Sequence, residues 1–299
     1  MGINDNQSIG TRLDWVNYMV SVSRNIDKIS RKDYKLNITQ SRILMYVATH
    51  DVQPIGNVAT ALFLKASTIT ASMDILEKKG FIERSATTDD KRHVCVGITD
   101  AGREVAPHYI FILQDIFADI AKDFPGERQE QLLEVASHFI ATTVSYADFD
   151  ADAEVQSIMS NLDTGLTEEE IALHVRRAFI VEVISYFLAR ASVYDRQVNL
   201  SINEGRIIRT LGNNKKGLRL SAISDYISIR PNVATVSVSA LLDKNLVKRE
   251  VDPYDRRAAC VSLTREGKKL LSVNNPGYCV MFDSCFPGLA ELDIHDFTA

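Results

Sequence analysis

The chain has 299 residues, of which 45% are hydrophobic and 24% are charged. That length is enough to bury one large core or two of ordinary size, which excludes a disordered tail or a peptide. The formal net charge is −5, which argues against wholesale coating of nucleic acid, although the charges are unevenly distributed along the chain.

The sequence predicts neither export nor a membrane partner. The longest apolar runs, such as residues 178–183, are well short of the roughly 18 residues that a membrane helix needs. Residues 1–8 are polar and lack the basic start and apolar stretch of a signal peptide, so we expect a cytoplasmic protein. The four cysteines are too few and too unevenly spaced for a disulfide framework, and we expect thiols.

The first part of the chain has the periodicity of helices followed by a hairpin. Apolar residues at helical spacing predict a long helix from about Thr11 onward, then helices at residues 39–49, 55–62 and 67–79. The period then changes from 3.6 to 2, which predicts strands at 81–84 and 94–98 around a charged tip at 87–92. Two more amphipathic helices are expected at 101–124 and 127–146.

A polar, acidic stretch separates this part from the next. Residues 148–166 are rich in Asp, Ser and Asn, a composition that suits a linker. Thr167 and Glu170 then have the spacing of a capping box, so a new helix is expected to begin at that point.

The second part shows the same succession of elements. After the helix that starts near 167, we expect helices at 203–211, at 220–227 and from Asn232, then strands at 246–250 and 259–263 around a tip at 252–257. The helix that follows meets Asn274, Asn275, Pro276 and Gly277 soon after Leu271, and we expect it to stop there. The second part is therefore expected to have a truncated C-terminal helical region.

The two parts are related in sequence. Ile38, Arg42 and Ile43 recur as Ile202, Arg206 and Ile207 at an offset of 164. After one slip the offset becomes 165, and further matches run from Val58 and Ile223 to Gly102 and Gly267. We interpret the chain as a domain at 1–147, an acidic linker at 148–166 and a second domain at 167–299. Short helices followed by a two-stranded ribbon predict a mainly α protein made of tandem winged helix-turn-helix domains with two small β-wings.

Several motifs resemble the MarR family of bacterial transcriptional regulators. They are Ile38-Thr39-Gln40, the LEKKGFIER run at 76–84, the DDKRH wing tip, and their counterparts LLDKNLVKRE at 241–250, DPYDRR at 252–257 and SLTREG at 262–267. The resemblance covers roughly 11–147 and 168–273. Members of this family are usually homodimers whose flanking helices form the dimer and often a ligand pocket. Two copies in one chain therefore suggest an asymmetric, covalent pseudo-dimer.

The third helix of each winged domain is the expected reader of DNA bases in the major groove. The candidate contacts are Ser67, Thr68 and Thr70 in the first domain, and Arg230, Asn232, Thr235 and Ser239 in the second. Ser67 and Asn232 also stand where a helix favours an N-cap, and both interpretations stay open. The resemblance implies arginine near positions 66 and 71, where this chain has alanine, a departure that weakens the case for sequence-specific binding.

The wing tips are expected to enter the minor groove, whose negative potential attracts cations. The candidate contacts are Lys91, Arg92, Arg256 and Arg257, and the resemblance implies that Asp90 and Asp255 support the wings. The alternative is a solvated turn. Residues 36–104 have no net charge, whereas residues 200–271 have a net charge of +7, so we expect the second domain to bind DNA more strongly.

Other candidate sites are weaker. Trp15, Tyr18 and Met19 on the first helix could line a ligand pocket, although aromatic residues at helical spacing are more often core. Strand alternation turns Cys95 and Cys260 away from the valines that follow them, so they are candidate accessible thiols or simply packing residues. The histidines and cysteines lack metal-ligand spacing, and there is no enzyme motif, so we expect no metal, no cofactor and no catalysis.

We therefore expect a ligand-responsive, DNA-binding transcriptional regulator. Its expected partners are double-stranded DNA and a small-molecule effector, and the chain is expected to be a monomeric pseudo-dimer or a homodimer. The alternative function is a ligand-sensing or protein-interaction scaffold, derived from the same family, that has lost sequence-specific DNA binding.

Overall fold

A computed structural model describes residues 5–50, 52–86, 94–123, 150–214, 216–251 and 259–291. The protein is mostly helical with two small antiparallel sheets, as expected. It forms two compact units: unit 1 consists of Met1–Ser21 and Tyr186–Ala299, and unit 2 of Val22–Ser185. The expected domain boundaries at 147 and 167 do not coincide with these units. The long helices α1 (Asp5–Asp33) and α9 (Glu168–Gln197) each contribute residues to both units.

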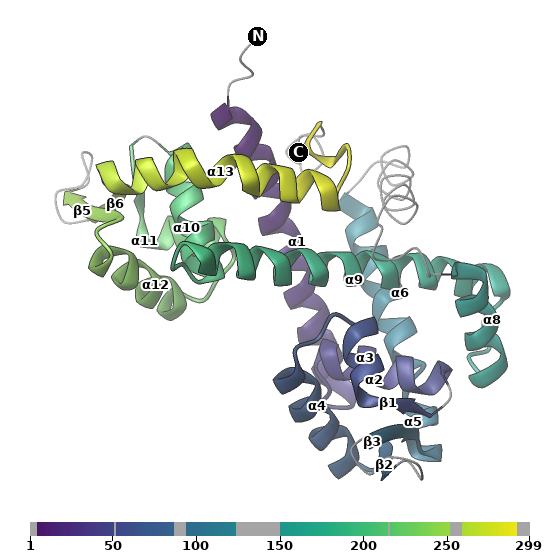
Figure 1. The fold of residues 1–299 in the computed structure, drawn as a ribbon. Helices are drawn as coiled ribbons and strands as arrows, with labels where there is room; N and C mark the ends of the chain where they lie inside the picture. The colour runs from purple at the N-terminus through teal and green to yellow at the C-terminus, as the bar shows by residue number, and fades with distance from the viewer. Residues whose placement is uncertain are drawn as a thin grey trace. The chain divides into compact units, whose positions relative to one another are not determined.

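Unit 2 contains the first predicted series of elements (Figure 1). They are α2 (Ile38–Thr49), β1 (Gln53–Pro54), α3 (Ile55–Ala61), α4 (Ala66–Lys78), β2 (Ile82–Ala86), β3 (Val94–Ile98), α5 (Asp100–Val105) and α6 (His108–Asp123). The sheet has the order β1-β3-β2, so the expected two-stranded wing gains a third strand. That strand escaped prediction because two residues are too few to show a period. The expected helix at 127–146 lies outside the described residues.

The core of unit 2 lies between its helices and its sheet. On α4, the side chains of Ile69, Met73 and Leu76 are at most 3% exposed. They join Ile43 of α2 and Val96 of β3 in one apolar cluster. The α2 helix begins in a capping box, since Asn37 and Gln40 each accept a hydrogen bond from the other's backbone N–H. The alternation of buried and exposed positions therefore fixes which face of α4 is turned to solvent.

The segment expected to be a linker is a helix instead. Residues Ala151–Asn161 form α8, which Asp150 caps by accepting hydrogen bonds from the N–H groups of Asp152 and Ala153. Val155 and Ile158 on this helix are buried in the unit 2 core. The prediction was wrong because the acidic residues stand in the first turn of a helix, where its dipole favours negative charge. At the start of α9, the expected capping box between Thr167 and Glu170 is confirmed.

Unit 1 contains the second series of elements (Figure 1). They are α10 (Ile202–Asn213), β4 (Leu218–Arg219), α11 (Leu220–Tyr226), α12 (Pro231–Asp243), β5 (Val247–Val251), β6 (Ala259–Leu263), α13 (Arg265–Cys285) and a 3-10 turn, η2 (Leu289–Glu291). The sheet again has a third short strand, in the order β4-β6-β5. On α12, Ala234, Val238 and Leu241 are fully buried.

The last long helix of unit 1 does not stop where the sequence predicted. α13 continues through Pro276 to Cys285. Its far half buries Tyr278 and Phe282, and Phe187 packs edge-on against both rings. This packing compensates for the backbone hydrogen bond that a proline removes. The expected early truncation of this helix is therefore wrong.

The same backbone strain recurs at matching positions of the two winged-helix regions. Non-glycine residues with positive φ occur at Lys35 and Phe63 in unit 2 and at Asn199 and Ser228 in unit 1. These positions match at the offsets of 164 and 165 found in the sequence. A positive φ is uncommon outside glycine, so its recurrence at matching sites indicates two copies of one turn geometry.

The two wing cysteines are not accessible. Cys95 and Cys260 are each 7% exposed. Cys95 has Pro54 and Ser85 as its cross-strand neighbours, and Cys260 has Arg219 and Glu250. Because each cysteine is on the middle strand of three, side chains on both sides cover it, which simple alternation along a hairpin does not reveal. The expectation of accessible thiols is therefore wrong.

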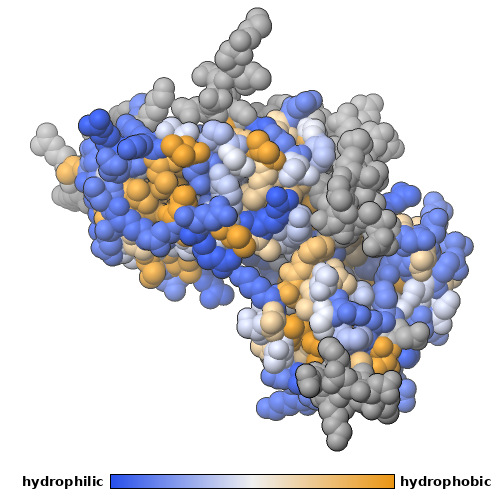
Figure 2. All heavy atoms as spheres, viewed as in Figure 1, coloured by the Kyte–Doolittle hydropathy of each residue, from blue (hydrophilic) through white to orange (hydrophobic). Residues whose placement is uncertain are grey.

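Within the described residues, no single helix is long and apolar enough to cross a membrane. The helices α3 and α4 pass that test only when taken together, and the chain bends by 115° between them. On the face shown in Figure 2, hydrophilic side chains predominate and hydrophobic ones form scattered patches.

Candidate nucleic-acid interface and cavity

The face of α4 that is turned away from the core carries the predicted DNA contacts. Ser67, Thr68 and Thr70 are all exposed. The capping interpretation of Ser67 is wrong, because the helix begins at Ala66 and its N-cap is Lys65, which makes no side-chain cap. The Ser67 side chain therefore stands in the first turn with its hydroxyl open to solvent.

The corresponding face of α12 is also exposed. Arg230, Asn232, Thr235 and Ser239 are all open to solvent. Arg230 is the N-cap and Pro231 is the first helical residue, so Asn232 does not occupy the N-cap position. Its side-chain oxygen accepts a hydrogen bond from the N–H of Val233, 3.0 Å away, which leaves its amide NH₂ turned to solvent.

The two matching threonines make the same local contact. Thr70 donates its hydroxyl to the carbonyl of Ala66, and Thr235 donates to the carbonyl of Pro231, both at 2.9 Å. Each hydroxyl oxygen keeps its acceptor capacity. The two helices therefore present similar small polar groups, and neither presents a long basic side chain at positions 66 and 71 or at the matching Pro231 and Val236.

The two units differ in the arginine beside α4 and α12. In unit 2, Arg84 on β2 lies 2.7 Å from the carboxylate of Asp74 and 3.5 Å from that of Glu77, both on α4. In unit 1 the matching Arg249 on β5 is exposed, and no acidic side chain among the described residues pairs with it. The sequence could have shown this difference, because the positions that match Asp74 and Glu77 are Ser239 and Leu242.

The structure does not describe the wing tips, where DNA contacts are predicted. Asp90, Lys91, Arg92, Asp255, Arg256 and Arg257 lie outside the described residues. The strands that lead to both tips are in place, so the roles assigned to these six residues stay predictions.

Each winged-helix region is clasped by a buried arginine that the sequence analysis did not single out. In unit 2, Arg42 of α2 forms a two-pronged ion pair with Glu182 of α9 and donates to the carbonyl of Leu62. In unit 1, Arg206 of α10 donates to the side chain of Asn17 on α1 and to the carbonyl of Ile227. All these partners match at the repeat offsets. The recurrence of arginine at 42 and 206 was the signal that could have revealed them.

The three residues expected to line a ligand pocket lie on the part of α1 that belongs to unit 1. Trp15 and Met19 are buried, and the rings of Trp15 and Tyr18 meet edge to face at 6.1 Å. Their role in ligand binding stays untested.

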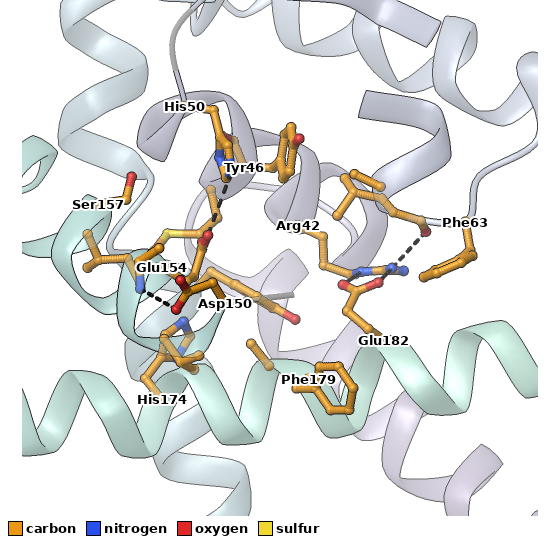
Figure 3. A pocket seen from close by; sticks show the side chains of 18 of the residues that line it. Arg42, Tyr46, His50, Phe63, Asp150, Glu154, Ser157, His174, Phe179 and Glu182 are labelled. Atoms are coloured by element: carbon orange, nitrogen blue, oxygen red, sulfur yellow. Dashed lines mark hydrogen bonds and ion pairs between the residues drawn. The ribbon is translucent and has the colours of Figure 1, made fainter. Parts of the chain in front are cut away.

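A cavity of about 680 Å³ lies within unit 2, between the winged-helix region and the helices α6, α8 and α9 (Figure 3). Its apolar wall includes Met45, Leu62, Val175 and Ala178, and four aromatic rings line it: Tyr46, Phe63, Tyr109 and Phe179. Its described lining does not include Trp15, Tyr18 or Met19. The cavity was not predicted because helices distant in sequence, and the supposed linker, form it together.

The charged groups of the cavity are paired or engaged. Arg42 faces Glu182, and the ring of His50 lies 3.7 Å from the carboxylate of Glu154 (Figure 3). Burial raises the pKa of Glu182 and of Glu154, and the opposing effects of Arg42 and His50 are smaller. Asp150, the N-cap of α8, also lines the cavity.

In the described part of the chain, two buried polar groups in the same cavity have no hydrogen-bond partner. Neither the Nδ1 of His174 nor the hydroxyl of Tyr109 makes a hydrogen bond within the described residues. The two rings meet edge to face at 5.9 Å. Burial lowers the pKa of His174 to about 3, with a further contribution from Arg177, and raises the pKa of Tyr109. Both groups are therefore neutral near pH 7. Among the described residues, no cluster of His, Cys, Asp and Glu could hold a metal ion.

The amino-acid sequence matches a family described as "Transcriptional regulator SarA/Rot" over residues 25–108. A similar relative is the HTH-type transcriptional regulator SarZ of Staphylococcus haemolyticus, 24% identical over 115 residues that cover 38% of this chain and 77% of that protein. The uncharacterized HTH-type transcriptional regulator YkoM of Bacillus subtilis is 31% identical over 106 residues, which cover 34% of this chain and 66% of YkoM.

Among solved structures, the crystal structure of an S. aureus MepR-DNA complex superposes with a TM-score of 0.37 at 20% identity, covering 43% of this chain and 96% of that one. The matched residues 25–108 contain α2, α3, α4 and the strands of the first wing. Residues 25–108 of this chain are thus similar to the SarA/Rot family of transcriptional regulators.

Proposed function

We propose that this regulator binds double-stranded DNA by placing α4 and α12 in successive major grooves and its wings in the minor groove. The observation that carries the proposal is the exposed polar face found on both helices at the same positions. The N-terminal residues of a recognition helix contact base edges in this arrangement, and Ser67 and Asn232 stand in the first helical turn. Hydroxyl and amide groups suit both bases and phosphates.

The two winged-helix regions act as the halves of a covalent pseudo-dimer in this proposal. Three features support it: the repeated order of elements, the positive φ values at matching positions, and the matching clasps of Arg42 and Arg206. Half-sites would then be about one helical turn, roughly 34 Å, apart. Since the units differ in sequence and charge, the operator would be an imperfect palindrome. A regulator of this kind acts in the cytoplasm.

Regulation by a small molecule belongs to the same proposal. The unit 2 cavity is large enough for a drug-sized molecule, for which pockets of roughly 300–1,000 Å³ are usual. It lies against α2 and α3, the helices that hold α4 in place. A ligand there would alter the support of the recognition helix.

The test compares binding of the full chain to its own upstream DNA and to random duplex by fluorescence anisotropy across a salt series. We expect a preference for the upstream DNA and a steep fall of affinity with salt, because several phosphates are neutralised. Replacing Arg256 and Arg257 should weaken binding more than replacing Lys91 and Arg92, because residues 200–271 carry the net positive charge.

The alternative function is a ligand-sensing or protein-interaction scaffold. Alanine at positions 66 and 71 and the pairing of Arg84 with Asp74 favour it. Equal and feeble binding to both duplexes at low salt would establish this alternative over sequence-specific regulation.

A further inference from the structure

We infer that Val236 of α12 contacts the methyl group of a thymine in the major groove, so that the half-site bound by unit 1 has an A·T pair opposite the middle of this helix. The inference deepens the DNA binding proposed above and rests on it. It adds an apolar, specificity-determining residue to the polar contacts expected on α12.

Val236 is an apolar side chain in the middle of a polar surface. It is 69% exposed, and helical spacing places it on the same face as Asn232, four residues before it, and Ser239, three residues after it. Both of these neighbours are exposed. The opposite face of α12 contributes Val238 and Leu241 to the apolar core of unit 1. Valine is a weaker helix former than alanine, so neither packing nor helix propensity accounts for a valine at position 236.

The matching position of unit 2 is also apolar. At the offset of 165, Val236 corresponds to Ala71 of α4, which is exposed as well. One exposed apolar side chain is ordinary on a protein surface. Here, however, the same position is apolar on both helices, between polar groups that are proposed to face DNA. Valine ends in two methyl groups and alanine in one, so the contact of unit 1 is expected to be the larger.

Thymine is the base whose major-groove edge suits such a side chain. Its C5 methyl is the one methyl group that the four bases present there, and small apolar side chains contact it. The commonest guanine contacts need arginine or lysine, and α12 has neither between Pro231 and Asp243. Asparagine is a usual partner of adenine, and the amide NH₂ of Asn232 is turned to solvent. The exposed face of α12 therefore suits A·T pairs.

The experiment replaces each thymine of the upstream duplex in turn by uracil, which lacks only the methyl group. Binding of the full chain is measured by fluorescence anisotropy. We expect uracil at one or two positions to weaken binding about fourfold, as burial of one methyl group predicts. In the variant Val236→Ser the same replacements should have no effect, because serine has no methyl group. Serine and valine have similar helix propensities, so α12 should remain intact.

The variant Val280→Ser is the matched control. Val280 is 70% exposed on α13 of the same unit and is not among the proposed DNA contacts. This variant should keep the fourfold loss at the same thymines. Because the contact carries no charge, Val236→Ser should leave both the affinity for random duplex and its dependence on salt unchanged. Unchanged binding to random duplex also shows that the variant is folded.

The outcomes separate this inference from the proposed function. If uracil weakens binding of Val236→Ser as much as binding of the original chain, the methyl groups act through the shape of the duplex, and the inference is overturned. A preference for the upstream duplex that no uracil replacement alters would also overturn it, while the proposed function stands. Absence of any preference for the upstream duplex would overturn the proposed function and the inference with it.

Discussion

Arg84 and Arg249 occupy matching places on the strands that follow α4 and α12, and within the described part of the chain only Arg84 is neutralised by acidic side chains. Its guanidinium contacts Asp74 and Glu77 of α4. Ion pairs that are partly open to water contribute little to stability, so the chief effect of this one is on the surface potential beside the helix. The face around α4 loses a cation to its own acidic residues, whereas the face around α12 keeps Arg249.

The matched variants Arg84→Gln and Arg249→Gln test this difference. Arg249→Gln should lower non-specific DNA affinity several-fold at low salt and reduce the salt slope by about one phosphate contact. Arg84→Gln should change both quantities much less, because its charge is already compensated. Anisotropy titrations with a random duplex at four salt concentrations measure both quantities. Equal losses in the two variants would show that Arg84 leaves its acidic partners to meet DNA.

A second prediction concerns the effect of His174 on how the stability of the fold depends on pH. Burial lowers its pKa from the ordinary value of 6.5 to about 3 in the folded chain. Between these values the unfolded chain takes up a proton that the folded chain refuses, so stability falls as pH falls below 6.5. The loss should reach about 1.4 kcal/mol at pH 5.5. It is absent at pH 8, where the histidine is neutral in both states.

The variant His174→Leu should therefore flatten the dependence of unfolding free energy on pH between 6.5 and 4.5. Urea titrations at half-unit pH steps give the slope. Tyr109→Phe serves as the control, since the phenol does not titrate in this range and its removal should preserve the slope. An unchanged slope in His174→Leu would mean that the histidine is protonated in the folded chain.

At the scale of elements, α13 shows how packing overrides a local signal. Asn274, Pro276 and Gly277 predicted a helix end, yet the helix continues because Tyr194 of α9 donates its hydroxyl to the carbonyl of Asn274 at 2.8 Å. The side chain of Asn274 in turn accepts from Arg209, whose guanidinium lies 3.8 Å from the centre of the Tyr278 ring. Glycine at 277 leaves room for the Tyr194 hydroxyl.

Gly277→Ala should accordingly destabilise unit 1, although alanine is the better helix former by about 1 kcal/mol. An added Cβ would collide with the Tyr194 hydroxyl, and crowding of this kind typically costs about 1–3 kcal/mol. Gly56→Ala on α3 is the control, because a Cβ there meets nothing within 4 Å. Thermal unfolding compares the two. A higher melting temperature for Gly277→Ala would indicate that the hydroxyl moves away at no cost.

The sequence predicted those features of the protein that depend on the local spacing of apolar residues. The periods of 3.6 and 2 gave the wing strands and the three short helices of each winged-helix region to within about two residues, whereas α1 begins six residues before Thr11 and the single helix expected at 101–124 is divided into α5 and α6. The clasps of Arg42 and Arg206, the cavity and the covering of Cys95 and Cys260 depend on residues far apart in the sequence. The helix α8 was not predicted from the sequence, because its acidic first turn has the composition of a linker.

On the scale of the whole molecule, each half of the chain supplies a helix to the winged-helix region of the other half. Glu182 of the second half binds Arg42 in unit 2, and residues 12–17 of the first half bind in unit 1, where Arg12 pairs with Asp283 and Asn17 with Arg206. In a regulator made of single-domain chains, such helices would have to come from a second copy. Here the covalent connection brings them together at a fixed effective concentration.

Because each half of the chain supplies a helix to the winged-helix region of the other half, we predict that the protein is a monomer and that one chain binds one operator. Light scattering after size-exclusion chromatography should give the mass of a single chain, 33.4 kDa, at micromolar concentration. DNA affinity should not depend on protein concentration through a dimerisation step, since no subunit association precedes binding. The variant Arg42→Met tests the contact between the two halves of the chain. It leaves the carboxylate of Glu182 buried without its partner and should lower the free energy of unfolding of unit 2 by about 3–5 kcal/mol. A mass twice that of the chain, with affinity lost on dilution, would instead show that a second copy completes the DNA-binding unit.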